Sequence, residues 1–171
     1  MIAPPTIRTD RLVLRGLYGD DTDAFLRYFQ SDRARFTGGP KSARDAWRHL
    51  AANLGHWALR GFGMFAVTRT GNDAIIGMIG HWYPLGWAEP EIGYLLFDAA
   101  DEGQGLASEG VRACIDHAYG PLGWDTAVSY IDPDNSASIR LAERMGAVRD
   151  DTAPQPQASH PVVIYRHRTP A

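Results

Sequence analysis

The segment from residue 101 to residue 110 combines closely spaced glycines with the expected start of a helix. It reads Asp-Glu-Gly-Gln-Gly-Leu-Ala-Ser-Glu-Gly. Gly103 and Gly105 permit tight backbone turns whose main-chain N–H groups converge, and the first turn of a helix adds unpaired N–H groups and a positive dipole end. This combination favours an anion, and we expect a pyrophosphate to fit it. The structural alternative is a glycine-rich turn that only starts a helix.

Two widespread phosphate-binding motifs fit this segment poorly. The nucleoside-triphosphate motif Gly-x-x-x-x-Gly-Lys-Ser/Thr requires a lysine, and this segment has none. The dinucleotide motif Gly-x-Gly-x-x-Gly would place its last small residue at Ser108, and its glycines would directly follow a buried strand near the start of a parallel sheet. Here residues 98–102 intervene and antiparallel strands are expected before them. A dinucleotide-dependent oxidoreductase is therefore the weakest of three functional hypotheses.

Hydrophobic periodicity predicts the elements that position this loop. A capping-box pattern at Ser42 and Asp45 starts a helix that stops at Gly61, with Trp47, Leu50, Leu54 and Trp57 on its apolar side. Other helices are expected over 20–32, 106–119 and 136–145, and strands over 6–15, 65–68, 75–83, 91–97, 126–132 and 162–167. Residues 150–161 are expected to form an exposed loop. The order predicts the α/β class, with antiparallel strands before a parallel pair that is joined by a helix.

Composition limits the other possibilities. The 171 residues, 44% of them hydrophobic, suit a single domain over residues 1–171. The net charge is −3 without a basic run, which disfavours nucleic acid, and no stretch approaches the 18 or so apolar residues of a membrane span. The lone cysteine, Cys114, excludes an internal disulfide and fits a cytoplasmic protein; it shares a helix face with Ala107, Val111 and Ala118, so we expect it to be buried. The six histidines lack the spacing of metal ligands, so no metal is expected.

Four short motifs in register resemble the GNAT acetyltransferases, in the branch that includes N-terminal acetyltransferases of ribosomal proteins. The loop resembles the coenzyme A motif Gln/Arg-x-x-Gly-x-Gly/Ala from its fourth position on, although Glu102 occupies the first position. The other matches are Thr9 to Arg15, the Glu-Ile-Gly-Tyr-Leu-Leu segment 91–96, and the set Asn135, Ser138, Glu143, Arg144 and Gly146. The resemblance implies a GNAT-like mixed central sheet with antiparallel N-terminal strands and a splayed parallel pair, flanked by helices.

The resemblance also implies the cofactor and its contacts. Acetyl-CoA is the expected co-substrate. Its phosphates and pantetheine arm are expected at Leu95, Leu96, Phe97, Gly103, Gln104, Gly105, Leu106, Ala107, Ser108, Asn135 and Ser138. The main-chain N–H of Leu96 or a neighbour is the expected oxyanion donor, because splayed strands leave backbone groups unpaired. For Asn135, capping of the following helix is the alternative role.

Acetyl transfer to an amine also needs a base and a proton for the departing thiolate. Glu91 is the expected base, acting directly or through water; a solvated carboxylate at a strand end is the alternative, and Glu89 is the reserve candidate. Many GNAT enzymes carry a tyrosine acid seven residues after the asparagine, but Ala142 stands there. The resemblance offers Ser138 instead, as a proton donor or a sulfur-binding hydroxyl.

The expected acceptor is a primary amine, either a protein N-terminus or a small molecule. Trp82, Tyr83 and Trp87 flank the loop before Glu91 and could form the wall of the acceptor pocket, although core packing is the alternative. The leading hypothesis is direct transfer from acetyl-CoA in a ternary complex. The second is a non-catalytic acyl-CoA-binding module. A homodimer is a further partner arrangement that this size of protein allows.

Overall fold

The computed structural model describes residues 3–156 and 160–170, and within them eight strands form one mixed sheet. All neighbouring strands are antiparallel except β5 and β6. In spatial order the strands are β1 (Ile7–Arg8), β2 (Leu12–Arg15), β3 (Met64–Arg69), β4 (Asn72–Trp82), β5 (Glu91–Leu96), β6 (Val128–Ile131), β8 (Val163–Arg166) and β7 (Val148–Arg149).

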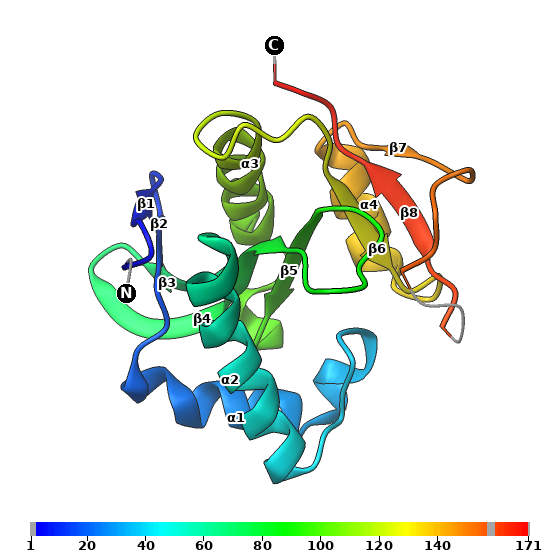
Figure 1. Ribbon diagram of the computed structural model, residues 1–171. Helices are drawn as coiled ribbons and strands as arrows, with labels where there is room; N and C mark the ends of the chain where they lie inside the picture. Colours follow the sequence, from blue (N-terminus) through cyan, green and yellow to red (C-terminus); the bar gives the residue numbers. More distant parts are fainter. Residues whose placement is uncertain (1–2, 157–159, 171) are drawn as a thin grey trace.

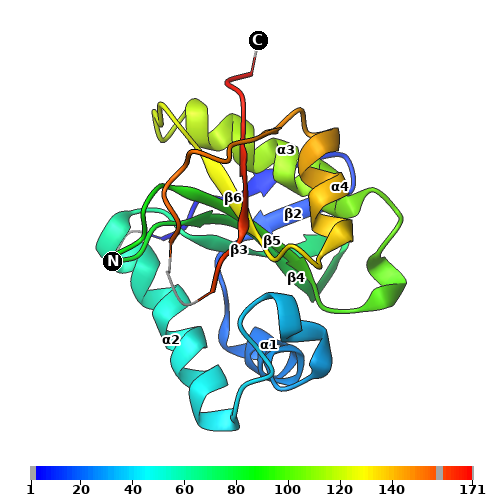
Figure 2. The same cartoon turned by 90° about the vertical axis from the view of Figure 1, so that its right-hand side faces the viewer.

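Helices cover both faces of this sheet (Figure 1). Helices α1 (Thr22–Phe29) and α2 (Ala43–Arg60) pack together on one face, and α3 (Leu106–Tyr119) lies on the other. Helix α4 (Ser136–Arg144) contacts α3 and β6, as Figure 2 also shows. Short 3-10 helices occupy Gly19–Asp21, Asp32–Phe36 and Ala99–Asp101.

The parallel strands β5 and β6 separate almost as soon as they meet. Only Glu91 and Val128 are paired across them, whereas β6 continues in full register with β8. The main chain of β5 beyond this pair therefore has no strand on its β6 side. The predicted splayed pair is confirmed, and the opening between the strands is where a ligand can reach backbone groups.

The core on the α3 side fixes the position of the glycine loop. Val111 and Cys114 of α3 are fully buried against β2, β3 and β4, which confirms the buried thiol. Gly110 permits the close approach, because a Cβ atom there would lie 2.5 Å from Cδ1 of Ile79. This packing fixes the distance between the start of α3 and the sheet, and so it also fixes the position of the glycine loop.

Two predicted elements near the N-terminus are wrong in extent. Residues 6–15 form the hairpin β1–β2 and not one strand, because the Thr9 side chain accepts a hydrogen bond from the Leu12 N–H at 3.0 Å and closes a turn. The helix predicted over 20–32 is shortened to α1, with 3-10 helices on both sides. The hairpin β3–β4 and the helices α3 and α4 appear where the periodicity placed them.

The apolar side predicted for α2 is confirmed at Leu50 and Trp57 and wrong at Trp47 and Leu54. Trp47 and Leu54 are 58% and 48% exposed, and the buried row runs through Ala46, Leu50, Asn53 and Trp57 instead. The predicted and observed rows share residues 50 and 57 and differ by one residue at the other two positions, so periodicity alone could not choose between them. The short strand β7 was not predicted; of the loop predicted at 150–161, residues 157–159 lie outside the described residues.

Candidate functional site

Two cavities adjoin at the opening between β5 and β6. The loop cavity, about 680 Å³, is bordered by the glycine loop and the start of α3. The Glu91 cavity, about 630 Å³, extends from the same opening toward α2 and the loop after β4. The two share the lining residues Phe36, Thr37, Tyr94, Leu95, Asn135 and Ser138. A molecule in one cavity can therefore meet a molecule in the other at Tyr94 and Ser138.

The glycine loop has the geometry that its sequence predicts. Gly103 and Gly105 have φ angles of +71° and +78°, a region that glycine adopts without strain, and Gly105 is the N-cap of α3. The first turn of α3 points its unpaired N–H groups toward the loop cavity. Gly103, Gly105, Leu106, Ala107 and Ser108 all line it.

A polar cluster from the opposite end of the chain holds this loop. Arg11 donates to the Gln104 carbonyl at 2.9 Å and to the Glu109 carboxylate at 2.6 Å, and Thr9 donates to the same carboxylate at 2.6 Å. Partial burial alone would raise the pKa of Glu109, but these hydrogen bonds and the Arg11 charge lower it overall. The residues of the first sequence motif thus anchor the loop.

Two of the expected cofactor residues do not line either cavity. The Gln104 side chain turns away and bonds with Arg69 at 3.0 Å and with the Ala100 carbonyl. Phe97 donates its N–H to the Ile76 carbonyl of β4 at 2.8 Å, so this group is already paired. The Gln104 side chain and the Phe97 main-chain N–H thus help to fix the loop and the sheet, and the role of these two positions in cofactor binding stays a prediction.

The main-chain donors that face the opening come from Tyr94 and Leu96. Alternate residues of an antiparallel pair direct their N–H and C=O groups to opposite sides. Phe97 bonds toward β4, whereas the Ile92 carbonyl accepts a hydrogen bond from Ser129 of β6 at 2.7 Å. Tyr94 and Leu96 share the orientation of Ile92, so their N–H groups point into the opening, which narrows the expected oxyanion donor to these two.

Arginines line the loop cavity, and sequence reasoning missed them. Arg33, Arg35, Arg140 and Arg144 border it, and none of the arginines in the described part of the chain borders the Glu91 cavity. Arg33 pairs with the Glu102 carboxylate and donates to the Phe97 carbonyl at 2.8 Å. The acidic residue at the first position of the motif is therefore neutralised by a cation from a distant segment. The spacing of 140 and 144, one helical turn apart, was the available signal.

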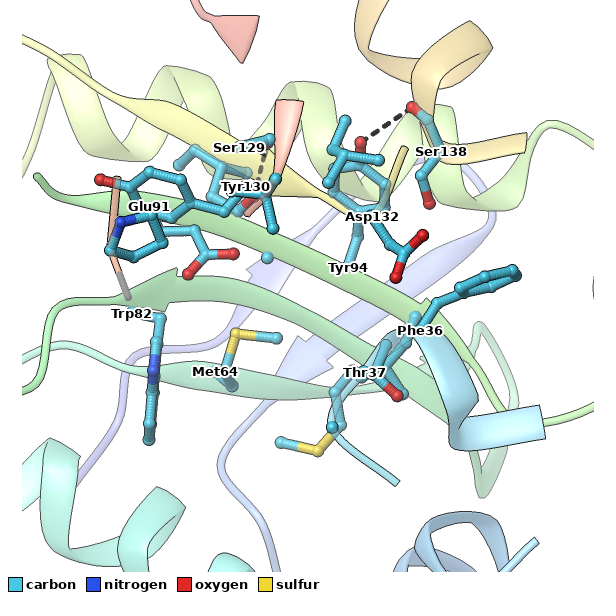
Figure 3. Close-up of a pocket in the computed structure, with 18 of the residues that line it drawn as sticks. Phe36, Thr37, Met64, Trp82, Glu91, Tyr94, Ser129, Tyr130, Asp132 and Ser138 are labelled. Carbon is cyan, nitrogen blue, oxygen red and sulfur yellow. Dashed lines mark hydrogen bonds between the residues drawn. The ribbon is translucent and has the colours of Figure 1, made fainter. Parts of the chain in front are cut away.

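Glu91 lies in the wall of the second cavity with its carboxylate directed inward (Figure 3). Its Oε2 accepts a hydrogen bond from the Trp87 indole at 2.9 Å, and the Trp87 ring packs edge-on against Tyr130. Burial raises the pKa of Glu91 to about 7, although the hydrogen bonds from Trp87 and Tyr130 oppose the rise. A carboxylate with this pKa can accept a proton near neutral pH.

The reserve candidate Glu89 is engaged elsewhere. Its two carboxylate oxygens accept hydrogen bonds from Arg166 at 2.8 and 3.0 Å, and Arg166 also pairs with Asp150. Glu89 lines neither cavity. A carboxylate that is held by a guanidinium outside both cavities cannot meet an amine inside one of them, so the geometry favours Glu91.

The three aromatic residues expected at the acceptor pocket divide into two groups. Trp82 and Trp87 line the Glu91 cavity, and Trp82 stacks on His56 with ring centroids 4.6 Å apart. Tyr83 does not line it, because the chain turns there: its N–H donates to His56 at 3.0 Å and its ring lies under Arg60. The role of Tyr83 at an acceptor site stays a prediction.

Ser138 and Asn135 lie where the two cavities meet. The Tyr94 hydroxyl donates to the Ser138 carbonyl at 3.0 Å, and burial raises the pKa of this phenol, which keeps it protonated (Figure 3). The Asn135 side chain accepts from the Ser138 N–H at 3.2 Å, so it caps α4. Ala142 is fully buried in a separate cluster and faces neither cavity. Tyr94 is a polar group at this junction for which the sequence suggested no role.

Other kinds of site receive no support from the described residues. Within 3–156 and 160–170, no group of three or more His, Cys, Asp or Glu side chains is arranged to hold a metal ion. None of the helices in the same ranges combines the length and the apolar character that crossing a membrane requires.

Comparisons with known proteins agree with this geometry. An acetyltransferase structure from Agrobacterium tumefaciens str. C58 is 33% identical, with a TM-score of 0.91 over 98% of this chain and 96% of that one. The uncharacterized N-acetyltransferase YoaA of Bacillus subtilis (strain 168) is 26% identical over 97% of this chain and 92% of its own. A shorter match, 34% identical over 79 residues, covers 46% of this chain and only 44% of the B. subtilis protein YkkB.

The ribosomal L7/L12 alpha-N-protein acetyltransferase RimL, solved in complex with coenzyme A, shares the fold at 21% identity and a TM-score of 0.74, over 95% of this chain and 97% of that one. The family model for the acetyltransferase (GNAT) domain matches residues 11–148. Enzymes of this family use acetyl-CoA as co-substrate. The chain belongs to the GNAT family of acetyltransferases.

Proposed function

We propose that the protein, as one domain over residues 1–171, transfers an acetyl group from acetyl-CoA directly to a primary amine in a ternary complex. The observation that supports this most is the division of charge between two adjoining cavities. The loop cavity is bordered by four arginines and by three acidic residues, whereas the Glu91 cavity is bordered by the carboxylates of Glu91 and Asp132 and by one lysine, Lys41. Cations therefore outnumber acids around the loop cavity, and acids outnumber cations around the Glu91 cavity. The first suits a ligand with phosphates, and the second suits a cationic amine.

The residues around the loop cavity fit coenzyme A. The main-chain N–H groups of residues 103–108 would hold the pyrophosphate, and the arginines would neutralise the remaining phosphate charge. The free N–H groups of Tyr94 and Leu96 would bond the pantetheine arm or the acetyl oxygen, with the Asn135 amide nearby. Acetyl-CoA would supply the activated acetyl thioester. These assignments extend the cofactor contacts expected from the sequence by adding the arginines.

Glu91 acts as the base in this proposal. At pH 7 an α-amine, with a pKa near 7.8, costs about 1 kcal/mol to deprotonate, and a lysine, with a pKa near 10.4, about 4–5 kcal/mol. A carboxylate with a pKa of about 7 can take a proton from an α-amine more readily than from a lysine, because the pKa of the α-amine is closer to its own. Glu91 accepts the proton of the amine, directly or through water, and a main-chain N–H of Leu96 or Tyr94 stabilises the developing oxyanion.

Ser138 is the proposed proton donor to the departing thiolate: its hydroxyl gives a proton to the sulfur and takes one from the newly acetylated nitrogen, so the hydroxyl is restored and the amide is neutral. It stands at the junction of both cavities, which is where a thioester would meet an amine. Tyr94 is a positioning residue in this scheme, because its hydroxyl bonds the Ser138 carbonyl and so fixes the first turn of α4. Its protonated phenol also makes it the alternative acid.

The lining of the Glu91 cavity indicates the kind of amine. Apolar side chains such as Phe29, Met64, Met78 and Trp82 form most of it. Figure 3 shows the Glu91 and Asp132 carboxylates on different sides of the space, with Met64 and Trp82 across from Glu91. An acceptor with a carboxylate beside its amine would meet these two acids. Lys41, the one lysine or arginine among the described residues that borders this cavity, already donates a hydrogen bond to the Gly38 carbonyl. We therefore propose an amine with an apolar or aromatic body and no adjacent carboxylate, from a peptide N-terminus or a small molecule.

A matched series of acceptors tests this proposal. Phenylalaninamide, phenethylamine and a peptide with N-terminal phenylalanine should each be acetylated with a kcat/KM at least about tenfold above that of free phenylalanine. Release of the coenzyme A thiol and the mass of the product measure the rate. A preference for the free amino acid would contradict the proposed acceptor class, whereas the absence of any transfer would contradict the activity.

A non-catalytic acyl-CoA-binding module is the second candidate. The buried Ala142 in place of a tyrosine acid and the acidic Glu102 favour it. Both candidates bind coenzyme A, so only turnover separates them. If no amine in the series is acetylated although calorimetry shows coenzyme A binding, the module is the better description.

A further inference from the structure

The part of the Glu91 cavity wall that α2 forms carries a polar side chain that is almost completely buried. Asn53 is 2% exposed and borders this cavity. Its Nδ2 donates a hydrogen bond to the His49 carbonyl at 2.9 Å, which fixes the orientation of the amide, because nitrogen and not oxygen must face a carbonyl. No described residue donates a hydrogen bond to the Asn53 Oδ1. The donor to this oxygen therefore has to come from a molecule inside the cavity.

His49 lies one helical turn before Asn53 and borders the same cavity. Its ring is held in place by aromatic neighbours, with centroid distances of 4.6 Å to Phe29 and 6.3 Å to Trp82. Neither of its ring nitrogens takes part in a hydrogen bond within the described part of the chain. Burial lowers the pKa of His49 to about 4, so at neutral pH the ring is uncharged and offers one donor and one acceptor.

The other histidine on this side of α2 shows the contrast with a structural imidazole. His56 accepts a hydrogen bond from the Tyr83 N–H at 3.0 Å, and its second ring nitrogen bonds with the Phe62 carbonyl at 2.8 Å. Both nitrogens are thus used within the fold, and His56 borders neither cavity. His49, two helical turns earlier, has a packed ring but no such bonds. Packing explains its ring and leaves its nitrogens available to a ligand.

The two α2 residues lie away from the junction of the cavities. Neither His49 nor Asn53 borders the loop cavity. Trp82 connects them to the proposed base, because it is paired with Glu91 across β4 and β5, and its side chain lies across from Glu91 in Figure 3. An acceptor with its amine at Glu91 would therefore direct its opposite end along the apolar wall toward α2.

The charges near this place favour an uncharged group at that end of the acceptor. The charge of Lys41 acts on His49, so a second ammonium group there would be repelled. A carboxylate would face the Asn53 oxygen, which cannot donate. A hydroxyl carries a donor and an acceptor on one atom, and it matches an amide oxygen beside a neutral imidazole.

We propose that His49 and Asn53 form a subsite for an uncharged hydroxyl group at the end of the acceptor remote from its amine. The hydroxyl donates to the Asn53 Oδ1, and its oxygen accepts from a ring N–H of His49. This inference rests on the proposed function, because it takes the amine to be at Glu91. It narrows the acceptor from an amine with an aromatic body to one whose aromatic body carries a hydroxyl.

Two matched pairs of amines test the subsite. Tyramine differs from phenethylamine only by a hydroxyl on the far side of the ring, and a peptide with N-terminal tyrosine differs in the same way from one with N-terminal phenylalanine. With the protein saturated with coenzyme A, calorimetry should show at least about fivefold tighter binding of the hydroxylated member in one pair or both. The pair that shows the preference distinguishes a small amine from a peptide.

The failure of the subsite can be distinguished from the failure of the proposed function. No preference in either pair, or no binding of any of the four compounds, would overturn the subsite. Acetylation of phenethylamine without such a preference would leave the proposed function in place. Preferential binding without any transfer would support the subsite and contradict the activity.

Substitutions in α2 test the assignment of the two residues. Asn53→Leu and His49→Phe remove the polar atoms, and phenylalanine keeps an aromatic ring at position 49. Each should reduce the ratio of the two affinities to about one, while the affinity for phenethylamine changes less than about twofold. The control Met78→Leu alters the apolar wall and should keep the wild-type ratio. A wild-type ratio in both folded α2 variants would mean that these side chains have only a structural role, and would overturn the proposal.

Discussion

Glu91 has a pKa that serves the proposed chemistry and weakens the fold. Burial raises this pKa to about 7, from an ordinary value near 4.5. Between these values the folded protein binds a proton that the unfolded chain has lost, so the contribution of Glu91 to stability decreases as the pH rises from about 4.5 to 7. Above pH 7 a charged carboxylate lies in an apolar wall beside Trp87, which is unfavourable for the fold and useful for a base.

The variant Glu91→Gln separates these two effects. We expect kcat/KM to fall at least about a hundredfold, because the base is lost. The melting temperature should rise at pH 8 and change little at pH 4.5, because glutamine removes the buried charge. Coenzyme A affinity measured by calorimetry should stay constant. Unchanged turnover would show that Glu91 is not the base.

Ser138 and Tyr94 can be distinguished by matched substitutions. Ser138→Ala should lower kcat roughly tenfold or more, whereas Tyr94→Phe, which removes only the hydroxyl that bonds the Ser138 carbonyl, should have the smaller effect. Steady-state kinetics with phenylalaninamide provides the comparison. The reverse order of effects would assign the acid to Tyr94.

At the scale of single residues, the sequence predicted functional residues that belong to a local motif, where the neighbouring residues indicate a turn or a helix start. Gly103 and Gly105 stand out because a turn followed by a helix needs them. Arg33 and Arg140 could not be assigned, because they come from separate segments and an isolated arginine is ordinarily a solvated surface residue. Tyr94 was visible in a motif, but only the fold shows that its hydroxyl reaches α4.

At the scale of elements, the β1–β2 turn and the start of α3 act as one unit. Arg11 joins the Gln104 carbonyl to the Glu109 carboxylate, so the glycine loop is fixed before any ligand binds. A preformed loop loses less conformational entropy on binding than a mobile one. The first motif of the sequence therefore contributes to affinity without contacting the ligand.

Arg11→Ala tests this anchoring role. The dissociation constant for coenzyme A should rise roughly tenfold, since charge-assisted hydrogen bonds to the loop are lost. The matched control is Arg48→Ala, which removes an arginine from an exposed ion pair with Asp45 on α2. Calorimetric titration of both variants decides the matter; equal affinities would mean that the loop holds its shape without Arg11.

Helices and strands were predicted best where a glycine or a capping residue marks the end of a periodic hydrophobic pattern. Helix α3 has the predicted bounds because Gly105 precedes it and its buried face is unambiguous. The β1–β2 hairpin was missed because the turn depends on a side-chain bond of Thr9 and not on glycine or proline. In α2 two apolar rows compete, and only packing against α1 and the sheet selects the inner one.

At the scale of the whole molecule, we expect three histidines to control the response to acid: His81 and His167, which are buried, and His49, which is half-buried. Burial lowers the pKa values of His49, His81 and His167 to about 4, with the Lys41 charge adding to the shift at His49. Their unfolded value is near 6.5, so stability is fully present above pH 6.5 and is lost as the pH falls toward 4. The contribution of Glu91 to stability increases as the pH falls, but this is one group against three histidines.

We expect the protein to lose roughly 3 kcal/mol of stability between pH 7 and pH 5. Denaturant unfolding at the two pH values measures this change. A free energy of unfolding that is constant across this range would show that the buried histidines do not remain neutral.

The arrangement of two adjoining cavities is a property of the whole fold. It requires β5 and β6 to separate after one pair, α4 to lie over the opening, and α2 to close the far side. Periodicity predicts each helix and strand but not the separation of β5 from β6. The family resemblance predicted this splayed pair, and the structure confirms it. The separation of charge between the cavities appears only when distant segments come together.

The most direct measurement is a crystal structure of the protein with coenzyme A. We predict the pyrophosphate at the main-chain N–H groups of residues 103–108, the pantetheine arm between β5 and β6, and the sulfur beside Ser138. Coenzyme A bound away from this opening, with the glycine loop making no contact to a phosphate, would contradict the account.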